Sequence, residues 1–136
     1  MIRTIVRDQF FLRIPSRAAT AADAGIADDL LDTLRANADR CVGMAANMIG
    51  QSVRIIAFAD AGQYTVMFNP VVVSREGPYH CEEGCLSLDG FRPAKRYRTI
   101  EVRWQTRDMK TRTGRYSGFT AQIIQHEMDH LKGAII

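Results

Sequence analysis

A chain of 136 residues is long enough for one compact domain over residues 1–136 and too short for a second hydrophobic core. Apolar residues make up 46% and charged residues 24%, a balance that excludes disordered and fibrous classes, and the net charge is a modest +3. No apolar run approaches the roughly 18 residues of a membrane span, and charges interrupt the first apolar residues as they would not in a secretory signal. Three cysteines, an odd number, favour thiol or metal chemistry in a reducing compartment over a disulfide framework. We therefore expect a cytoplasmic protein with no membrane partner.

The first regular element expected is a helix over residues 21–39. The sequence Thr-Ala-Ala-Asp at residues 20–23 has the form of a capping box, in which a hydroxyl and a carboxylate three residues apart bind the first free N–H groups. The apolar residues Ile26, Leu30, Leu34 and Ala38 follow at i, i+4 spacing and predict one buried face. Small residues between positions 43 and 50 then allow a close backbone approach.

Strands are expected next, and a second helix at the end of the chain. Asn69-Pro70 and Gly77-Pro78 are expected to interrupt the sheet, and residues 112–115 to form a turn or a strand end. The segment 120–131 has helical periodicity. The order predicts an α+β fold, with a mostly antiparallel sheet packed around a C-terminal metal-binding helix and an N-terminal helix. The expected strands cover residues 53–59, 64–68 (joined to the first by a hairpin at 60–62), 71–73 and 99–106.

Basic residues are concentrated in one segment. Nine of the 18 lysines and arginines lie within residues 92–115, against two acidic residues there. Because these charges alternate with Ile100, Val102 and Trp104, a solvated face of antiparallel strands is the favoured interpretation. A contact with RNA or another polyanion is the alternative.

The strongest local signal for chemistry is the sequence His-Glu-Met-Asp-His at residues 126–130. Side chains at i and i+4 of a helix project from one face, one turn apart, so His126 and His130 can bind one metal ion. Glu127 lies beside the first histidine and can reach a metal-bound water. An amphipathic helix with two surface histidines is the alternative.

A third protein ligand is needed for such a metal, with the fourth position left open if the site is catalytic. Candidate third ligands, besides several carboxylates, are Cys41, His80, Cys81 and Cys85.

Three segments together resemble the peptide deformylase family. Glu-Gly-Cys-Leu-Ser at residues 83–87 and His-Glu-Met-Asp-His at 126–130, about 40 residues apart, resemble its second and third signature motifs. Cys-Val-Gly-Met-Ala-Ala-Asn-Met at 41–48 resembles the first motif, Gly-apolar-Gly-apolar-Ala-Ala-Pro-Gln. Three positions depart from that motif: Cys41, Asn47 and Met48.

The resemblance implies a metal-dependent enzyme that removes the N-terminal formyl group from formyl-methionyl peptides of nascent proteins. Cys85, His126 and His130 would ligate Fe²⁺, for which Zn²⁺, Ni²⁺ or Co²⁺ could substitute. Glu127 would take a proton from the metal-bound water and return it to the departing amine. The backbone N–H of Leu86 would be one donor to the oxyanion. Glu83 and Arg96 would support the ligands, unless they form an ordinary surface pair.

Met48 is the departure with chemical consequences. In the family, the Gln at this position donates a hydrogen bond to the oxyanion, and a Met side chain has no donor. Loss of one such donor typically costs about 10²–10³ in rate, so activity is expected to be reduced but not abolished. Gln51, a candidate substitute donor three residues along, would project differently. Alternatively, Met48 is simply an apolar side chain that lines a pocket.

The formylated peptide is expected to bind beside the first motif. The segment from Gly43 to Ala46, with Met44 and Ala45 inside it, would run next to it as an extended strand. Met44, Ile123 and the helix face before His126 would contribute walls of an apolar pocket, and Met48 would also contact the substrate. Each of these residues could equally be ordinary core.

The expected partner is an N-formylated peptide or nascent chain, and a transient ribosome contact is a further candidate. The chain stops six residues after His130, where many family members continue, so no ribosome attachment through such an extension is expected. A monomer and a homodimer are both open.

Two other functions remain open from the sequence. Cys81 could join Cys85, His126 and His130 in a closed structural site of a binding module. An open site without the oxyanion Gln could instead hydrolyse another N-acylated compound, or bind formylated peptides with little turnover.

Overall fold

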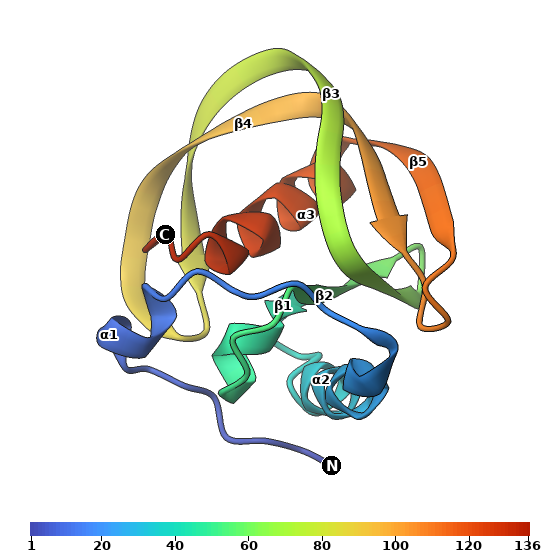
Figure 1. Ribbon diagram of the computed structural model, residues 1–136. Coiled ribbons are helices and arrows are strands. Elements are labelled where there is room, and N and C mark those ends of the chain that lie inside the picture. Colours follow the sequence, from blue (N-terminus) through green and yellow to red (C-terminus); the bar gives the residue numbers. More distant parts are fainter.

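A curved antiparallel sheet surrounds one helix in the computed structural model, which describes residues 1–136. The enclosed helix is α3 (Gly118–Leu131), and the sheet passes above and below it (Figure 1). The strands follow one another in the sheet in chain order, and every neighbouring pair is antiparallel. Their bounds are β1 (Gly43–Ala45), β2 (Ile55–Asp60), β3 (Gln63–Cys85), β4 (Leu88–Gln105) and β5 (Thr111–Ser117).

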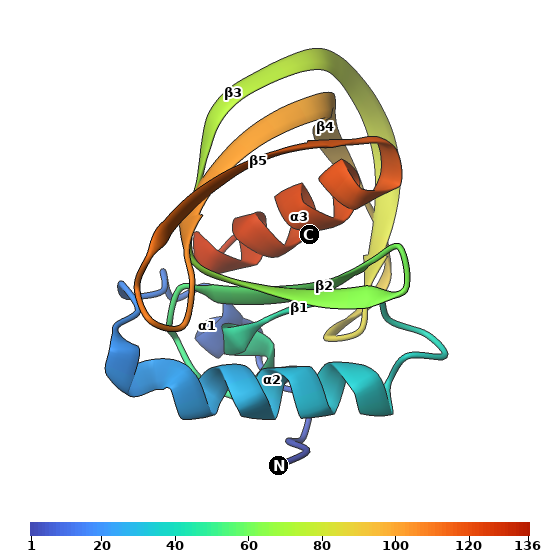
Figure 2. The same cartoon turned by 90° about the vertical axis from the view of Figure 1, so that its right-hand side faces the viewer.

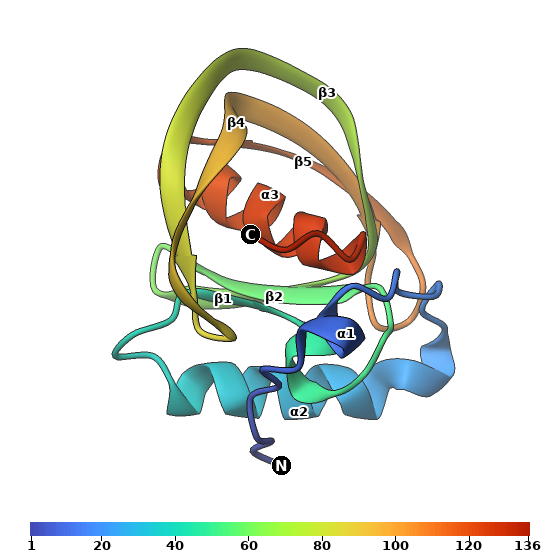
Figure 3. The same cartoon turned by 90° about the vertical axis from the view of Figure 1, so that its left-hand side faces the viewer.

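A second helix covers the outside of the sheet. Helix α2 (Ala24–Ala36) lies against β1 and β2, on the side away from α3 (Figures 2 and 3). The short helix α1 (Gln9–Leu12) and the 3₁₀ turn η2 (Ala46–Ile49) pack together beside it. The buried apolar side chains form one hydrophobic cluster, to which α2, the sheet and α3 all contribute. The predicted α+β fold is therefore confirmed.

The capping box confirms the predicted start of the first long helix, although its first turn is a 3₁₀ turn, η1 (Ala21–Asp23). The Thr20 hydroxyl accepts from the Ala22 N–H at 3.3 Å, and the Asp23 carboxylate accepts from the Thr20 N–H at 2.8 Å. The predicted end was wrong: α2 stops at Ala36 and Ala38 is exposed. The Asn37 side chain donates to the Thr33 carbonyl, so it competes for helix-terminal groups.

The expected breaks at Asn69-Pro70 and Gly77-Pro78 were wrong, because both lie inside the long strand β3. The pairing register with β4 shifts between Phe68 and Val71, and Gly77 has a φ of 73°. The register shift is a bulge, which bends a strand without ending it, whereas the pairing keeps its register on either side of Gly77. The curved β3 passes around α3 (Figure 1). Asn69 is held at a φ of 52° by side-chain hydrogen bonds to both backbone groups of Ala19.

The expected strand at 99–106 is the end of the longer β4, and the expected turn at 112–115 lies within β5. Buried apolar and exposed basic side chains alternate in this part of β4, as the interpretation of the basic segment as a solvated strand face requires. Ile100 and Val102 are buried, while Arg103 is exposed. None of the helices has the length and apolar character required to cross a membrane.

Candidate metal centre and substrate cavity

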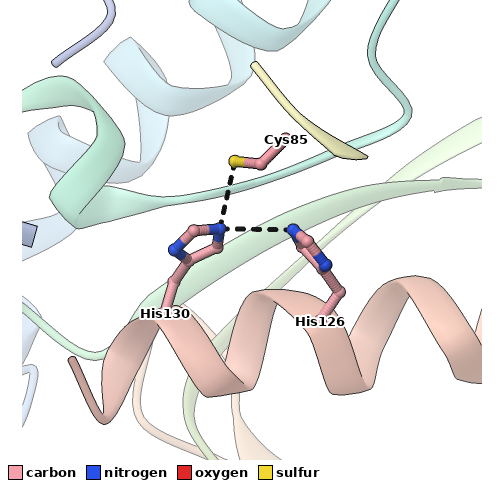
Figure 4. A group of neighbouring side chains, drawn as sticks. All are labelled: Cys85, His126 and His130. Atoms are coloured by element: carbon pink, nitrogen blue, oxygen red, sulfur yellow. Dashed lines mark hydrogen bonds between the residues drawn. The ribbon is translucent and has the colours of Figure 1, made fainter. Parts of the chain in front are cut away.

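Three side chains from two elements converge at one end of the sheet. Cys85 ends β3, and His126 and His130 lie one turn apart on α3 (Figure 4). His130 Nε2 lies 3.2 Å from Cys85 Sγ and 3.2 Å from His126 Nε2, and all three ligand atoms lie within 4.8 Å of one another. Ligand atoms around a tetrahedral ion with bonds of about 2.0–2.3 Å are separated by about 3.3–3.8 Å. The three atoms therefore fit one metal ion.

A buried carboxylate fixes the orientation of the first histidine. Glu83 Oε1 lies 2.8 Å from His126 Nδ1, so that nitrogen donates and Nε2 turns its lone pair toward the site. Arg96 binds both oxygens of the same carboxylate and also Asp129. Burial would raise the pKa of Glu83, but the hydrogen bonds from His126 and Arg96 hold it well below its usual range.

The alternative that Glu83 and Arg96 form a surface pair was wrong. Their side chains are only 7% and 4% exposed. A buried ion pair of this kind is stable only when its remaining donors and acceptors are also satisfied, and here the two charges link β3, β4 and α3 behind the candidate ligands.

The surroundings of the histidines favour a positive charge between them. Burial opposes a charge on His126, but hydrogen bonds to Cys85 and Glu83 outweigh it and raise its pKa to about 10. Burial and the charge of His126 lower the pKa of His130 to about 3, which leaves the neutral imidazole that binds metals. A cation bound by the thiolate and the two Nε2 atoms would take the place of the proton on His126.

Glu127 is the buried acid of the site. Its side chain is 5% exposed, and its Oε1 has no hydrogen-bond partner. Burial raises the pKa of Glu127 to about 7. A carboxylate with this pKa can both accept and release a proton near neutral pH.

A cavity of about 640 Å³ opens beside these residues. The exposed rings of Phe91 and Phe119 belong to its wall, together with Arg7 from the N-terminal segment. The predicted site residues on the wall are Gly43, Met48, Cys85, Leu86, Ile123, His126 and Glu127.

Two of the residues expected to bind the peptide lie elsewhere. Met44 and Ala45 are fully buried in the hydrophobic cluster and are absent from the cavity wall. The reason is that β1 lies between α2 and α3 and packs against both, so these side chains serve the core. Cys41 and Val42, just before β1, line the cavity instead.

The first and second motifs meet at the cavity wall, which both Met48 and Leu86 line. Met48 is 1% exposed, and its sulfur accepts a hydrogen bond from the Ala45 N–H at 3.5 Å. The Leu86 N–H makes no backbone hydrogen bond, so it is free to donate to a ligand. Gln51 is exposed and does not line the cavity. The side-chain amide of η2 belongs to Asn47 and donates to the His130 carbonyl, so the chain offers the Leu86 N–H without an amide from η2.

The other thiols lie outside the cluster of three. The Cys81 thiol is directed at Glu83 Oε2, 3.7 Å away, and the Cys41 thiol donates to the Gly43 carbonyl. The candidate ligand set is Cys85 with the two histidines, without Cys81. This arrangement argues against a closed shell of two thiolates and two imidazoles.

Sequence reasoning missed several residues that hold the site. Asn47 donates to the His130 carbonyl at 2.9 Å, and Arg7 donates to the Leu86 carbonyl and pairs with Asp89. Gln122 donates to Glu83 Oε2 at 3.0 Å. Gln122 could have been found, because residues 122, 126 and 130 follow at i, i+4 spacing on one face of α3. The contacts of Arg7 span most of the chain and leave no local signal.

Comparisons with known proteins agree with this geometry. The family model described as polypeptide deformylase matches residues 4–136. A peptide deformylase of Clostridium beijerinckii is 53% identical over 136 residues, all of both chains, and one of Dictyoglomus thermophilum is 36% identical over 82% of this chain and 72% of its own. The crystal structure of a peptide deformylase from Legionella pneumophila superposes with a TM-score of 0.88 and 31% identity, over 99% of this chain and 83% of that one. The chain belongs to the polypeptide deformylase family.

Proposed function

We propose that this chain, as a single domain, hydrolyses the formamide bond at the N-terminus of formyl-methionyl peptides and nascent chains, releasing formate. The observation that carries the proposal is the cluster of Cys85, His126 and His130, of which Cys85 and His126 line one cavity together with the buried Glu127. Family membership supports the reaction, and the residue roles below are our assignment.

Cys85, His126 and His130 would hold the metal ion, which we propose is Fe²⁺, with Zn²⁺, Ni²⁺ or Co²⁺ as substitutes. A thiolate beside two imidazoles suits these borderline divalent ions better than Mg²⁺ or Ca²⁺. A divalent ion in such a site polarises the substrate carbonyl and lowers the pKa of a bound water. Glu83 supports the set because it fixes the tautomer of His126.

Glu127 is the proton carrier. In its ionised form it removes a proton from the attacking water, and it then delivers that proton to the nitrogen of the departing amine as the bond to the formyl carbon breaks. In the metal-free protein burial raises the pKa of Glu127 to about 7, which favours the protonated form that delivers the proton. The amine leaves as the free N-terminus of the peptide.

The Leu86 N–H would donate to the formyl oxygen as negative charge develops on it. The methionine side chain of the substrate would occupy the cavity against Ile123 and Met48, with Gly43 at the backbone of the peptide. Any ribosome contact would be transient, and a monomer or a homodimer can present this cavity.

A second candidate function follows from Met48. Its sulfur accepts a hydrogen bond where the family motif has a donor, so this site offers less stabilisation to the oxyanion. The same machinery would then act on another N-acyl group, or bind formylated peptides with slow turnover.

Formate release from a formyl-methionyl tripeptide, by protein loaded anaerobically with Fe²⁺, tests the proposal. We expect turnover by the parent and its loss in Glu127→Gln, with the metal retained in both. A panel of formyl, acetyl and propionyl peptides separates the two functions. Preference for acetyl or larger groups would overturn the deformylase assignment. If the metal-loaded protein releases no product from any of these peptides, the remaining function is binding of formylated peptides with little or no turnover.

A further inference from the structure

We infer that Gln122 is a positioning residue for the metal centre, because it fixes the carboxylate that orients His126. The inference rests on the proposed function, since it presumes that His126 ligates the metal. Gln122 reaches that ligand only through Glu83, and it contributes no atom to the ligand set.

Both ends of the Gln122 amide are engaged. Its Nε2 donates to Glu83 Oε2 at 3.0 Å and lies 3.7 Å from Cys81 Sγ. Its Oε1 accepts from the Tyr79 hydroxyl at 3.4 Å. Because a carboxylate only accepts and a side-chain amide has one donating and one accepting end, these partners determine which way the amide faces.

Besides the Cys81 thiol, which lies 3.7 Å from Oε2, three side chains donate hydrogen bonds to Glu83. Oε1 accepts from His126 Nδ1 at 2.8 Å and from an Arg96 terminal nitrogen at 2.6 Å. Oε2 accepts from Arg96 Nε at 2.9 Å and from Gln122. Arg96 alone binds one edge of the carboxylate, about which the group can still swing. The Gln122 donor, on a different element from Arg96, opposes that swing and so keeps Oε1 aligned with His126.

The packing of the cavity wall does not explain why residue 122 is polar. Gln122 lines the cavity one turn before His126, next to the apolar side chains of Ile123 and Phe119. An apolar residue would serve the cavity wall equally well if packing were the only requirement. The amide instead joins the cavity wall to the support of the metal ligand, so that a cavity occupant would contact the same residue that steadies Glu83.

The test compares Gln122→Met with the parent in affinity for Co²⁺ and in the absorption spectrum of the Co²⁺ protein. Methionine keeps the length of the side chain and removes both hydrogen bonds. Gln122→Ala, which cannot clash, provides the same measurements if methionine disturbs folding. Loss of an outer partner of a metal ligand typically costs about 10–100-fold in metal affinity, and we expect a loss of about 10-fold here, with altered ligand-field bands and a lower kcat for deformylation.

Gln125→Met is the matched control. Gln125 lies on the same helix and binds the backbone of Tyr97 and Ala121, with no contact to Glu83. We expect this variant to lower the unfolding temperature and to leave Co²⁺ affinity and spectrum unchanged.

Unchanged Co²⁺ affinity and spectrum in both Gln122 variants would overturn the inference alone. So would an equal loss of affinity in Gln125→Met, because general loosening of α3 would then explain the result. A change in KM without a change in Co²⁺ affinity would reduce Gln122 to a cavity wall. A parent protein that binds no divalent ion would overturn the proposed function itself.

Discussion

Gly43 and Glu127 approach so closely that no side chain fits between them. A Cβ atom added to Gly43 would lie 2.9 Å from Glu127 Oε2 and 2.5 Å from Ile123 Cγ2. We expect Gly43→Ala to displace the carboxylate, lowering kcat/KM for deformylation at least 10-fold and stability by about 1–3 kcal/mol. Kinetics and urea unfolding of the same preparation measure both effects.

Gly25→Ala is the matched control for this substitution. Gly25 lies in α2, and an added Cβ would have no atom within 4 Å. Alanine is the better helix former, so we expect a gain of about 0.5–1 kcal/mol with unchanged activity. Normal kcat/KM in Gly43→Ala would show that Glu127 does not need its observed position.

Glu127→Gln should lower the activity of the enzyme and raise the stability of the metal-free protein above neutral pH. The substitution removes the proton carrier, and we expect kcat to fall about 10²–10⁴-fold. In metal-free protein the carboxyl group has a pKa of about 7, above the 4.5 of the unfolded chain, so the folded state binds this proton more tightly. Stability therefore falls as pH rises from 4.5 towards 7.

The amide introduced by Glu127→Gln cannot ionise, so the stability of the variant does not fall in this way as pH rises. We expect the metal-free variant to be more stable than the parent at pH 8, by on the order of 2 kcal/mol, and the advantage to vanish near pH 4.5. Urea unfolding at a series of pH values measures the difference. A constant difference across this range would contradict the assigned pKa shift.

Local patterns predicted the helices well, and the sheet less so. The capping box at Thr20 and Asp23 and the periodicity of α3 depend on contacts within one or two turns. The course of β3 depends on distant partners, because Asn69 keeps its positive φ through Ala19, which is 50 residues away in the sequence. Pro70 and Gly77 end strands in most contexts, and here pairing with β4 continues past both.

The two candidate histidines could be predicted from their i, i+4 spacing, and Cys85 from the family resemblance, whereas the cavity wall could not be predicted. Met44 and Phe119 illustrate the difference: the apolar Met44 is enclosed by two helices, and the equally apolar Phe119 is exposed at the cavity. Hydropathy is the same for both positions, and only the packing of β1 between α2 and α3 separates them. The sequence does not indicate that Arg7 supports the site either, because its partners Leu86 and Asp89 lie far away along the chain.

The two neighbouring cysteines should differ sharply in their effect on metal content. Cys85 Sγ belongs to the cluster with the histidines, whereas the Cys81 thiol contacts Glu83 and Gln122. We expect Cys85→Ser to lose most of its bound metal and all measurable deformylation, and Cys81→Ser to retain a full equivalent. Metal analysis after desalting decides this, and loss of metal from Cys81→Ser would revive the closed site.

Acid should weaken the N-terminal end of α2 through protonation of Asp23. Hydrogen bonds from Arg17 and the Thr20 N–H outweigh burial and lower the pKa of Asp23 to about 2, against an ordinary value of 3.8. The stabilisation is therefore complete above pH 3.8 and is lost as pH falls towards 2.

Asp23→Asn tests this assignment. Arg17 is largely exposed, so we expect a modest loss of about 1–2 kcal/mol at pH 7. The loss should shrink below pH 3.8, where the carboxyl group of the unfolded parent takes up a proton while that of the folded parent stays ionised until about pH 2. Unfolding by urea at pH 7 and pH 3 measures it, and an equal loss at both values would assign the effect to packing.

Met48 provides the most direct test of how this chain differs from the usual family motif. Its sulfur lies at the cavity wall and turns back to the Ala45 N–H, so a glutamine of similar length could replace it with little repacking. Gln at this position would add a donor beside the Leu86 N–H, and we expect kcat to rise, by up to about 10²–10³-fold if the new amide reaches the oxyanion. Met48→Leu, which adds no donor, is the control.

The two rates together distinguish the functions that the site allows. An active parent that Met48→Gln accelerates is a deformylase with one side-chain donor missing. An inactive parent and an active variant would mean that the scaffold is intact and that the natural substrate is not a formyl peptide. If Met48→Gln is slower than the parent while Met48→Leu is normal, the introduced amide does not donate to the oxyanion. The Leu86 N–H would then stabilise the oxyanion without a donor from η2.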